Sequence, residues 1–575
     1  MKKTMSYLGF ILMALVTFSS CSSKPDAPIP ADASFVMHID GASISEKLPW
    51  SEVKESQLFK DLLQEVDGNT EAEKILNDPK EFGLDLESDG WVFLSQKGKG
   101  AYSTFIWGLK DASKFEDVLK KANPNLSINK KESIQYIQED EIVVAWSDEN
   151  LMFLVDASEL TRDLNKSANA STGGTENWDG DYEEPFSLDG EALANIALEL
   201  QSLKSDEKLT DNDKFADLIS TDGDVHFWFN AGKFYDNTMA GNLMGLSKMG
   251  TLVEGNISAI TINFTDGGID IDSKGYMGKE LEELYQKYKA SNFNETALKN
   301  LPAGEVNLAL AINYPPEGLK SLLTLLGVDG LLNAYIQEGG FSIDEFINAN
   351  SGNIFLALSD FKINQVEKYL QSLDGEPIPY TTEEPDGKLL FGAEVNDRSA
   401  FQKMIDVSKR YLEEKMNMPA TGTENIPYEL KEKWFVAGNN PDQVNQFGST
   451  KTEHAFIDRI KGHPIGLFVN IQSFIKVAAT QISENKKLDK DIAALSSSFW
   501  KEIVMTGGEL EDGAMVTKLR ISLGDANTNS LKSLSKYIGQ LSKLAKEDEI
   551  RREQEWSEME EMQLYTDSTS IDPSY

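Results

Sequence analysis

Cysteine is almost absent from this chain. Cys21 is the only one in 575 residues, so no disulfide can form within a monomer, and burial of apolar side chains has to stabilise the fold. Histidine is also scarce, because only His38, His226, His454 and His463 occur and they lie far apart in the sequence. With no HExxH pattern, no CxxC pattern and no histidine cluster, the sequence gives no support for a zinc or redox-metal enzyme.

The motifs of common enzyme classes are missing as well. The sequence contains no GxSxG elbow, no GxxxxGK loop and no GxGxxG turn that opens a helix. Carboxylates are so abundant, with 94 Asp and Glu residues, that choosing two of them as a glycosidase pair would be arbitrary. His38 and His226 lie in strand-like runs, and we interpret them as core or sheet residues rather than ligands. We therefore predict no catalytic residues, no cofactor and no metal site.

Positive charge is in short supply. The chain has 55 Lys and Arg residues against 94 acidic ones, for a formal net charge of −39. Such a charge disfavours nucleic acid and bare anionic lipid surfaces, so we expect no nucleic-acid partner. The acidic clusters at 179–184 and 266–272 offer oxygen ligands for calcium, but neither has EF-hand spacing. We interpret them as solvated acidic segments.

A short apolar run near the start is the most informative feature that is present. Lys2 and Lys3 precede the apolar residues 7–18, and Ser19-Ser20 leads directly to Cys21. The run is too short for a membrane span, which needs about 20 residues. The pattern is typical of a bacterial lipoprotein signal, in which the cysteine receives the lipid. We predict a signal peptide at 1–20, lipidation of Cys21 and a lipidated tether at 21–28.

The residues after Cys21 bear on its destination. Ser22 stands where an inner-membrane retention signal typically has Asp, so we expect an outer membrane lipoprotein. The tether carries only one acidic residue, Asp26. This is a weak match to acidic export signals, so we expect a body that faces the periplasm, with exposure at the cell surface as the alternative.

Internal similarity divides the rest of the chain, which is longer than one hydrophobic core usually supports. Segments of the first part resemble segments of the second: 29–39 resembles 301–310, 105–115 resembles 391–401, 225–234 resembles 466–474, and 265–267 resembles 511–513. We interpret these matches as a tandem duplication with halves at 29–295 and 300–525. The alternative is that short apolar strands resemble one another by chance.

Strand-like segments, among them 353–358 and 389–395, and helix-like segments, among them 471–482, alternate without a regular βαβ rhythm, and the Asp-Gly pairs at 266–267 and 512–513 are typical of hairpin turns. Strands grouped around hairpins, with helices between them, indicate an α+β fold of mostly antiparallel sheet in two similar tandem halves. We expect an acidic loop at 165–189 in the first half. A stripe of Leu and Ile residues from Leu531 to Leu544 predicts a C-terminal helix at 526–563 that docks on the second half, followed by a disordered tail at 564–575.

The opening of the mature chain carries a resemblance. The lipoprotein signal, the sequence Ile29-Pro30-Ala31-Asp32 and the run Trp91-Val92-Phe93 resemble uncharacterised Bacteroidota lipoproteins that are grouped as a domain of unknown function. The resemblance implies export, lipid anchoring and a large α+β body. It implies no activity and no catalytic residues.

Two classes of function remain open from the sequence. The first, which we favour, is a noncatalytic binding or scaffolding module of the cell envelope, held to the membrane through Cys21 and recognising a protein, peptide or glycan. The second is a hydrolase of envelope or other polymers with a carboxylate site that matches no motif. A deep cleft with two converging acids of raised pKa would favour the enzyme, and a shallow surface with exposed aromatic side chains would favour the binder.

Overall fold

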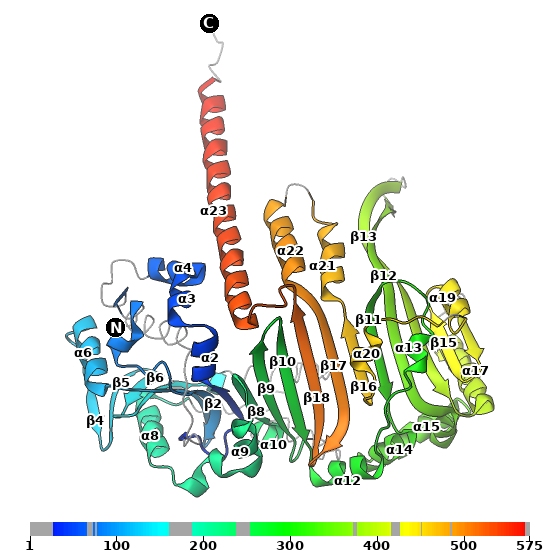
Figure 1. The fold of residues 1–575 in the computed structure, drawn as a ribbon, viewed down its shortest axis with the longest axis horizontal. Helices are drawn as coiled ribbons and strands as arrows, with labels where there is room; N and C mark the ends of the chain where they lie inside the picture. The colour runs from blue at the N-terminus through cyan, green and yellow to red at the C-terminus, as the bar shows by residue number, and fades with distance from the viewer. Residues whose placement is uncertain are drawn as a thin grey trace.

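A computed structural model describes residues 27–65, 73–74, 77–159, 187–236, 253–371, 377–415, 426–449, 451–483 and 486–569 (Figure 1). Eighteen strands in these ranges form one sheet, and every strand pairing that defines it is antiparallel. Helices pack against this sheet or extend from its ends. The predicted α+β class with mostly antiparallel sheet is therefore confirmed.

The first part of the chain contributes ten strands. In their spatial order they are β4 (Asn129–Lys131), β5 (Ile134–Glu139), β6 (Ile142–Trp146), β7 (Asn150–Asp156), β3 (Gly100–Gly108), β2 (Gly90–Lys97), β1 (Phe35–Ile39), β8 (Val225–Asn230), β9 (Ile257–Thr265) and β10 (Gly268–Tyr276).

The other edge of β10 pairs with β18, and through this pairing the second part of the chain continues the same sheet. In order, its strands are β18 (Ala514–Leu523), β17 (Trp500–Glu511), β16 (Ile465–Val469), β11 (Val306–Asn313), β12 (Asn350–Gln371), β13 (Pro377–Val395), β15 (Trp434–Gly438) and β14 (Tyr428–Lys431).

Six strands pair in the same order in the two parts: β3, β2, β1, β8, β9 and β10 in the first, and β13, β12, β11, β16, β17 and β18 in the second. β1 lies between β2 and β8, as β11 lies between β12 and β16. The Asp-Gly turns at Asp266 and Asp512 join the hairpins β9–β10 and β17–β18, as the sequence predicted. The division into units at 29–295 and 300–525 stays a prediction, because one sheet runs through both of them.

The two parts meet where β10 pairs with β18. Asp272 lies opposite Lys518 in this ladder, and each is the fifth residue of its strand. Because the strands are antiparallel, Tyr276 at the end of β10 lies opposite Ala514 at the start of β18. The pair Asp272 and Lys518 is therefore the centre of the ladder, about which β10 and β18 are related by an approximate two-fold rotation.

Helices connect the strands of the first part and close its ends. They are α2 (Gly41–Lys47), α3 (Trp50–Glu55), α4 (Gln57–Glu65), α6 (Ala112–Ala122), α8 (Gly190–Gln201), α9 (Asp213–Ser220), α10 (Ala231–Asp236), α12 (Lys279–Lys287) and α13 (Thr296–Lys299), with 3-10 turns at Pro79–Phe82, Ser205–Glu207 and Leu209–Asp211.

The second part has a corresponding set. Its helices are α14 (Pro316–Leu325), α15 (Asp329–Glu338), α16 (Ile343–Ala349), α17 (Arg398–Lys415), α19 (Pro441–Gln446), α20 (Ile457–Ile460), α21 (Ile471–Ala479), α22 (Lys487–Phe499) and α23 (Ser530–Thr569).

Large aromatic side chains are buried between the sheet and its helices in both parts of the chain. In the first half, Trp91 and Trp228 pack with residues of α8 and α9. In the second half, Phe355 and Phe468 pack with residues of α13 and α20. Alternate residues of each strand point to opposite faces, and the first part buries its opposite face as well, where Trp107 and Trp146 pack with Phe115 of α6.

β12 and β13 are much longer than the strands predicted at 353–358 and 389–395. Beyond the main sheet they form a two-stranded arm, which rises past the other strands in Figure 1. A bulge between Ser359 and Lys362 contains Asp360 with a φ of 52°. The bulge interrupts the apolar alternation, which is why the sequence pattern shows only the inner part of each strand.

The C-terminal helix α23 docks on both halves instead of on the second alone. The ring of Tyr537 stacks on Phe499 of α22 at 4.2 Å between centroids. Lys546 Nζ lies 2.5 Å from Asp61 Oδ1 of α4, in the first half. The prediction placed the helix on the second half because it follows β18, but β18 lies at the junction of the two halves. The helix includes residues 564–569 of the predicted tail, and 570–575 lie outside the described residues.

Candidate functional site

An apolar pocket lies between α21 and α22, where the chain leaves β16 and returns to β17. Asn470 ends β16 and caps α21, since its side-chain oxygen accepts a hydrogen bond from the Ser473 backbone N–H at 3.0 Å. α22 runs directly into β17 at Trp500. The two helices therefore extend from neighbouring antiparallel strands and lie side by side (Figure 1).

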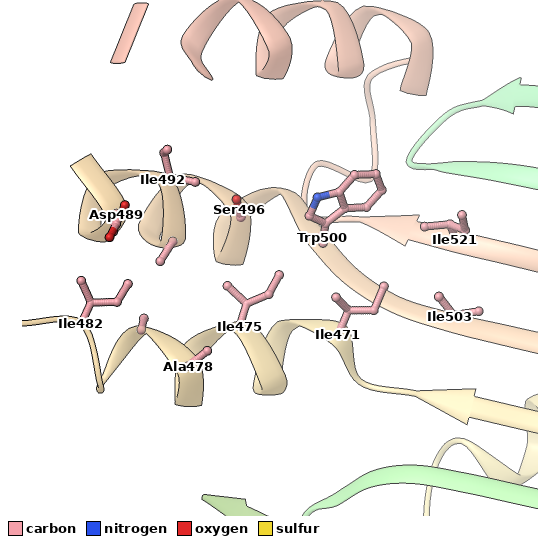
Figure 2. A pocket seen from close by; sticks show the side chains of 12 residues that line it. Ile471, Ile475, Ala478, Ile482, Asp489, Ile492, Ser496, Trp500, Ile503 and Ile521 are labelled. Atoms are coloured by element: carbon pink, nitrogen blue, oxygen red, sulfur yellow. The ribbon is translucent and has the colours of Figure 1, made fainter. Parts of the chain in front are cut away.

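The pocket has a volume of about 670 Å³ and an almost wholly apolar lining. Ile471, Ile475 and Ile482 point from the α21 side toward α22, and Trp500 closes the end where the strands begin (Figure 2). Ile503 of β17 and Ile521 of β18 form the floor at that end. The remaining lining residues are Ala478, Ala479, Asp489, Ile492, Ala493 and Ser496.

The walls of this pocket are not part of a hydrophobic core. No side chain of α22 is buried, and in α21 only Ser473 is. Helices of a globular protein usually bury their apolar stripe against another element. The isoleucines on the facing sides of α21 and α22 therefore form an apolar surface that the described part of the chain leaves open.

The few polar groups in the lining give no basis for catalysis. The Ser496 hydroxyl pairs with the Tyr537 hydroxyl at 2.8 Å, and among the described residues no hydrogen bond joins it to a histidine, lysine or carboxylate that could act as its base. Asp489 is exposed at the rim, 4.0 Å from Lys486. The pocket offers an apolar enclosure of the size that small-molecule sites have, without a reactive group inside it.

A buried polar cluster lies elsewhere, at one end of β1 and β8. Asp224 is fully buried, and both of its carboxylate oxygens lie 2.7 Å from Lys47 Nζ. The Ser43 hydroxyl and the Phe264 backbone N–H also donate to this carboxylate. These bonds attach α2 to β8 and β9, which is a structural role.

His38 and His226 face each other beside this cluster. They are 4% and 2% exposed, and they occupy directly opposed positions of β1 and β8. The two residues are thus in the buried sheet, as predicted. Burial and the neighbouring His38 lower the pKa of His226 to about 4.

The other two histidines are separate from the pocket and from each other. His454 stacks on Phe456, and burial lowers its pKa. His463 Nδ1 lies 2.6 Å from Glu509 Oε1. In the described ranges, no group of three or more His, Cys, Asp or Glu side chains is placed to hold a metal ion.

The residues singled out from the sequence fall in different places. Cys21, the predicted lipidation site, lies outside the described residues, as does most of the predicted acidic loop at 165–189. In the acidic cluster at 266–272, Asp270 forms an ion pair with Arg520 at 2.6 Å. Within the part of the chain that the structure covers, no helix is both long enough and apolar enough to cross a membrane.

The sequence did not identify the pocket residues as a site. The run 471–482 was predicted as an amphipathic helix, and an apolar stripe on a helix is usually core. The signal that could have raised the question is a second apolar helix directly after it, at 487–499, so that two apolar stripes face each other across one short connection.

Comparison with known proteins matches a family model to part of the chain and gives no activity. The family "Domain of unknown function (DUF4836)" matches residues 26–169. No curated protein matches the chain.

Solved structures of the protein TP0453 show a distant likeness. Its crystal form III is 10% identical, with a TM-score of 0.24, and the match covers 48% of this chain and 90% of that one. Crystal form I is 9% identical, with a TM-score of 0.23, and the match covers 47% of this chain and 90% of that one. These TM-scores are too low for a shared fold, so no structural or functional argument follows from them.

Proposed function

We propose that this chain is a lipid-anchored cell-envelope protein that acts by noncatalytic binding, and that the pocket between α21 and α22 takes an alkyl chain. The signal sequence that ends at Cys21 and the resemblance to Bacteroidota lipoproteins support the anchor and the location. The open apolar pocket supports the binding function.

The apolar lining of the pocket favours an alkyl chain over a peptide or a glycan. A peptide or glycan brings polar groups, and each of these costs free energy when it is buried without a hydrogen-bond partner. The side chains of the lining carry one hydroxyl, already paired with Tyr537, one carboxylate at the rim and the indole N–H of Trp500. An alkyl chain has no polar groups to satisfy and gains about 0.8 kcal/mol for each buried CH₂, so it fits this lining best.

The hydrolase alternative lacks a comparable observation. Among the described residues, Asp61, Glu345, Asp386, Asp458, Asp525 and Asp548 have a clearly shifted pKa, and in each the shift is downward. A general acid at neutral pH needs the opposite shift.

Two neighbouring alanines of α22 provide a matched test. Ala493 lines the pocket, whereas Ala494 is exposed and does not. The full chain carrying Cys21→Ser, which should be released from the membrane, is titrated with a fluorescent 16-carbon fatty acid. The same titration is made with Ala493→Asp and Ala494→Asp added.

Ala493→Asp places a charge inside the apolar pocket and should weaken the fatty acid at least tenfold, which is about 1.4 kcal/mol. Ala494→Asp makes the same change in the same helix and should leave the affinity within twofold. Equal affinities in the two variants would refute binding in this pocket.

A further inference from the structure

The apolar floor of the pocket continues across the sheet. Residues directly opposite each other in antiparallel strands share one face, so the register defines rows of side chains. The row that starts at the pocket floor crosses six strands through Ile521, Ile503, Val469, Leu308, Leu358 and Leu389. Every member of this row is aliphatic.

A second row lies beside the first, two residues further along each strand. It consists of Leu519, Met505, Leu467, Leu310, Leu356 and Phe391. All six side chains are apolar as well. We call these twelve residues the apolar rows.

None of the twelve side chains is buried. Ten are intermediate in exposure, and Leu389 and Phe391 are 41% and 37% exposed. The residues between them on the opposite face, such as Ala309, Ala357 and Leu390, are 0 to 1% exposed beneath the second-half core. Antiparallel sheets commonly leave a polar face to solvent, whereas here the open face carries the larger apolar side chains.

We propose that the apolar rows and the pocket together bind one lipid with two or more alkyl chains. This inference rests on the proposed function of the pocket and extends it from a single chain to a class of ligand. One chain lies between α21 and α22, and the others lie along the apolar rows. Ile503 and Ile521 belong both to the pocket lining and to the first row, so the chains of one molecule reach both surfaces without crossing a polar region.

The continuity with the pocket is what favours a lipid over a second copy of the protein. Two sheets can pack face to face through aliphatic rows, and such a contact would cover the twelve side chains. A contact between two sheets would leave the pocket between α21 and α22 empty, because most of this pocket lies beyond the ends of the strands. A branched set of alkyl chains covers both surfaces.

The test compares two lipids with the same headgroup, a lysophospholipid with one chain and a phospholipid with two. Each competes with the fluorescent fatty acid for the Cys21→Ser protein, below the concentration at which the lipid forms vesicles or micelles. Leu356→Gln changes the second row. Leu370→Gln is the control, since it is the same substitution in the same strand at a position in the arm that is 58% exposed.

We expect the two-chain lipid to bind the parent protein at least tenfold more tightly than the one-chain lipid. Leu356→Gln should reduce this ratio at least threefold and leave the one-chain affinity within twofold, and Leu370→Gln should change neither value. Equal affinities for the two lipids, or a ratio that Leu356→Gln does not change, would overturn the inference. The function of the pocket would still stand in that case if Ala493→Asp weakens the one-chain lipid.

Two further measurements keep the inference testable if Leu356→Gln fails to fold. A phospholipid with a photoreactive group in its second chain should label peptides from β11 and β12 of the Cys21→Ser protein, and labelling confined to α21 and α22 would contradict a role for the rows. Sedimentation should give a monomer. A dimer that two-chain lipid does not dissociate would assign the rows to a second copy.

Discussion

The Nδ1 atoms of His38 and His226 lie 3.0 Å apart. The other ring nitrogen of His226, Nε2, lies 3.0 Å from the Thr221 carbonyl oxygen. A carbonyl only accepts, so Nε2 of His226 carries its proton, and the Nδ1 of neutral His226 accepts from the Nδ1–H of His38. A second proton on His226 would set two N–H groups against each other inside the sheet.

This relationship predicts a loss of stability in acid. An unfolded histidine takes up its proton near pH 6.5, whereas burial and His38 lower the pKa of folded His226 to about 4. Between these values the unfolded state binds more protons, so stability is complete above pH 6.5 and falls as the pH drops toward 4. We expect a loss of roughly 3 kcal/mol over this range.

Urea unfolding at pH 7 and pH 4.5 measures this effect, with His226→Phe as the comparison. The variant should lose clearly less stability than the parent between the two pH values, whatever its stability at pH 7. The same loss in both proteins would show that His226 does not cause it.

Asp224 should be among the residues most sensitive to substitution. Asp224→Ala leaves Lys47 and the Phe264 N–H without their shared carboxylate, and breaking a buried ion pair in this way should cost roughly 3 kcal/mol. Asp217→Ala breaks an ion pair with Lys274 at the surface, where the side chains of Asp217 and Lys274 are 52% and 46% exposed. This substitution should cost less than about 1 kcal/mol. Urea unfolding at pH 7 compares the two, and equal losses would contradict the structural role given to Asp224.

Two truncations separate the docked part of α23 from the projecting part. A chain that ends after Glu549 keeps the contacts of Tyr537 and Lys546 and removes side chains such as Trp556, which is 69% exposed. Its thermal midpoint should stay within about 1 °C of the full chain. A chain that ends after Asn529 loses both contacts, and its midpoint should fall by several degrees. Equal midpoints would mean that the helix does not stabilise the fold.

The anchor predicts how the protein partitions. We expect the full chain to enter the detergent phase on Triton X-114 separation, because the proposed anchor places a lipid on Cys21. Cys21→Ser should move it to the aqueous phase, and Ser23→Ala should not. A Cys21→Ser protein that still partitions into detergent would contradict anchoring through this residue.

Local patterns were enough to predict the class of fold. The apolar run at 353–358 predicts a strand, and the Asp-Gly pairs at 266–267 and 512–513 predict hairpins, all of which the structure contains. A strand pattern does not show which face of the sheet is open. In β11 the large residues Leu308 and Leu310 are half-exposed, whereas the small residue Ala309 is buried, which is the reverse of what size alone indicates.

The candidate site depends on contacts that the sequence pattern does not encode. His38 and His226 are 188 residues apart, and nothing near either of them indicates the other. The pocket combines two consecutive helices with Ile521 of β18, and a stripe of isoleucines is the same signal for a core helix as for an open one. Only the burial of each side chain separates these cases.

The most direct measurement of the central claim is the lipid content of the protein as it is made in cells. The Cys21→Ser chain and its Ala493→Asp variant are purified without detergent, extracted with organic solvent and analysed by mass spectrometry. We expect close to one lipid with two or more chains for each Cys21→Ser molecule, and less than a tenth of that amount with Ala493→Asp. Equal amounts of lipid in the two proteins, or none in either, would contradict this claim.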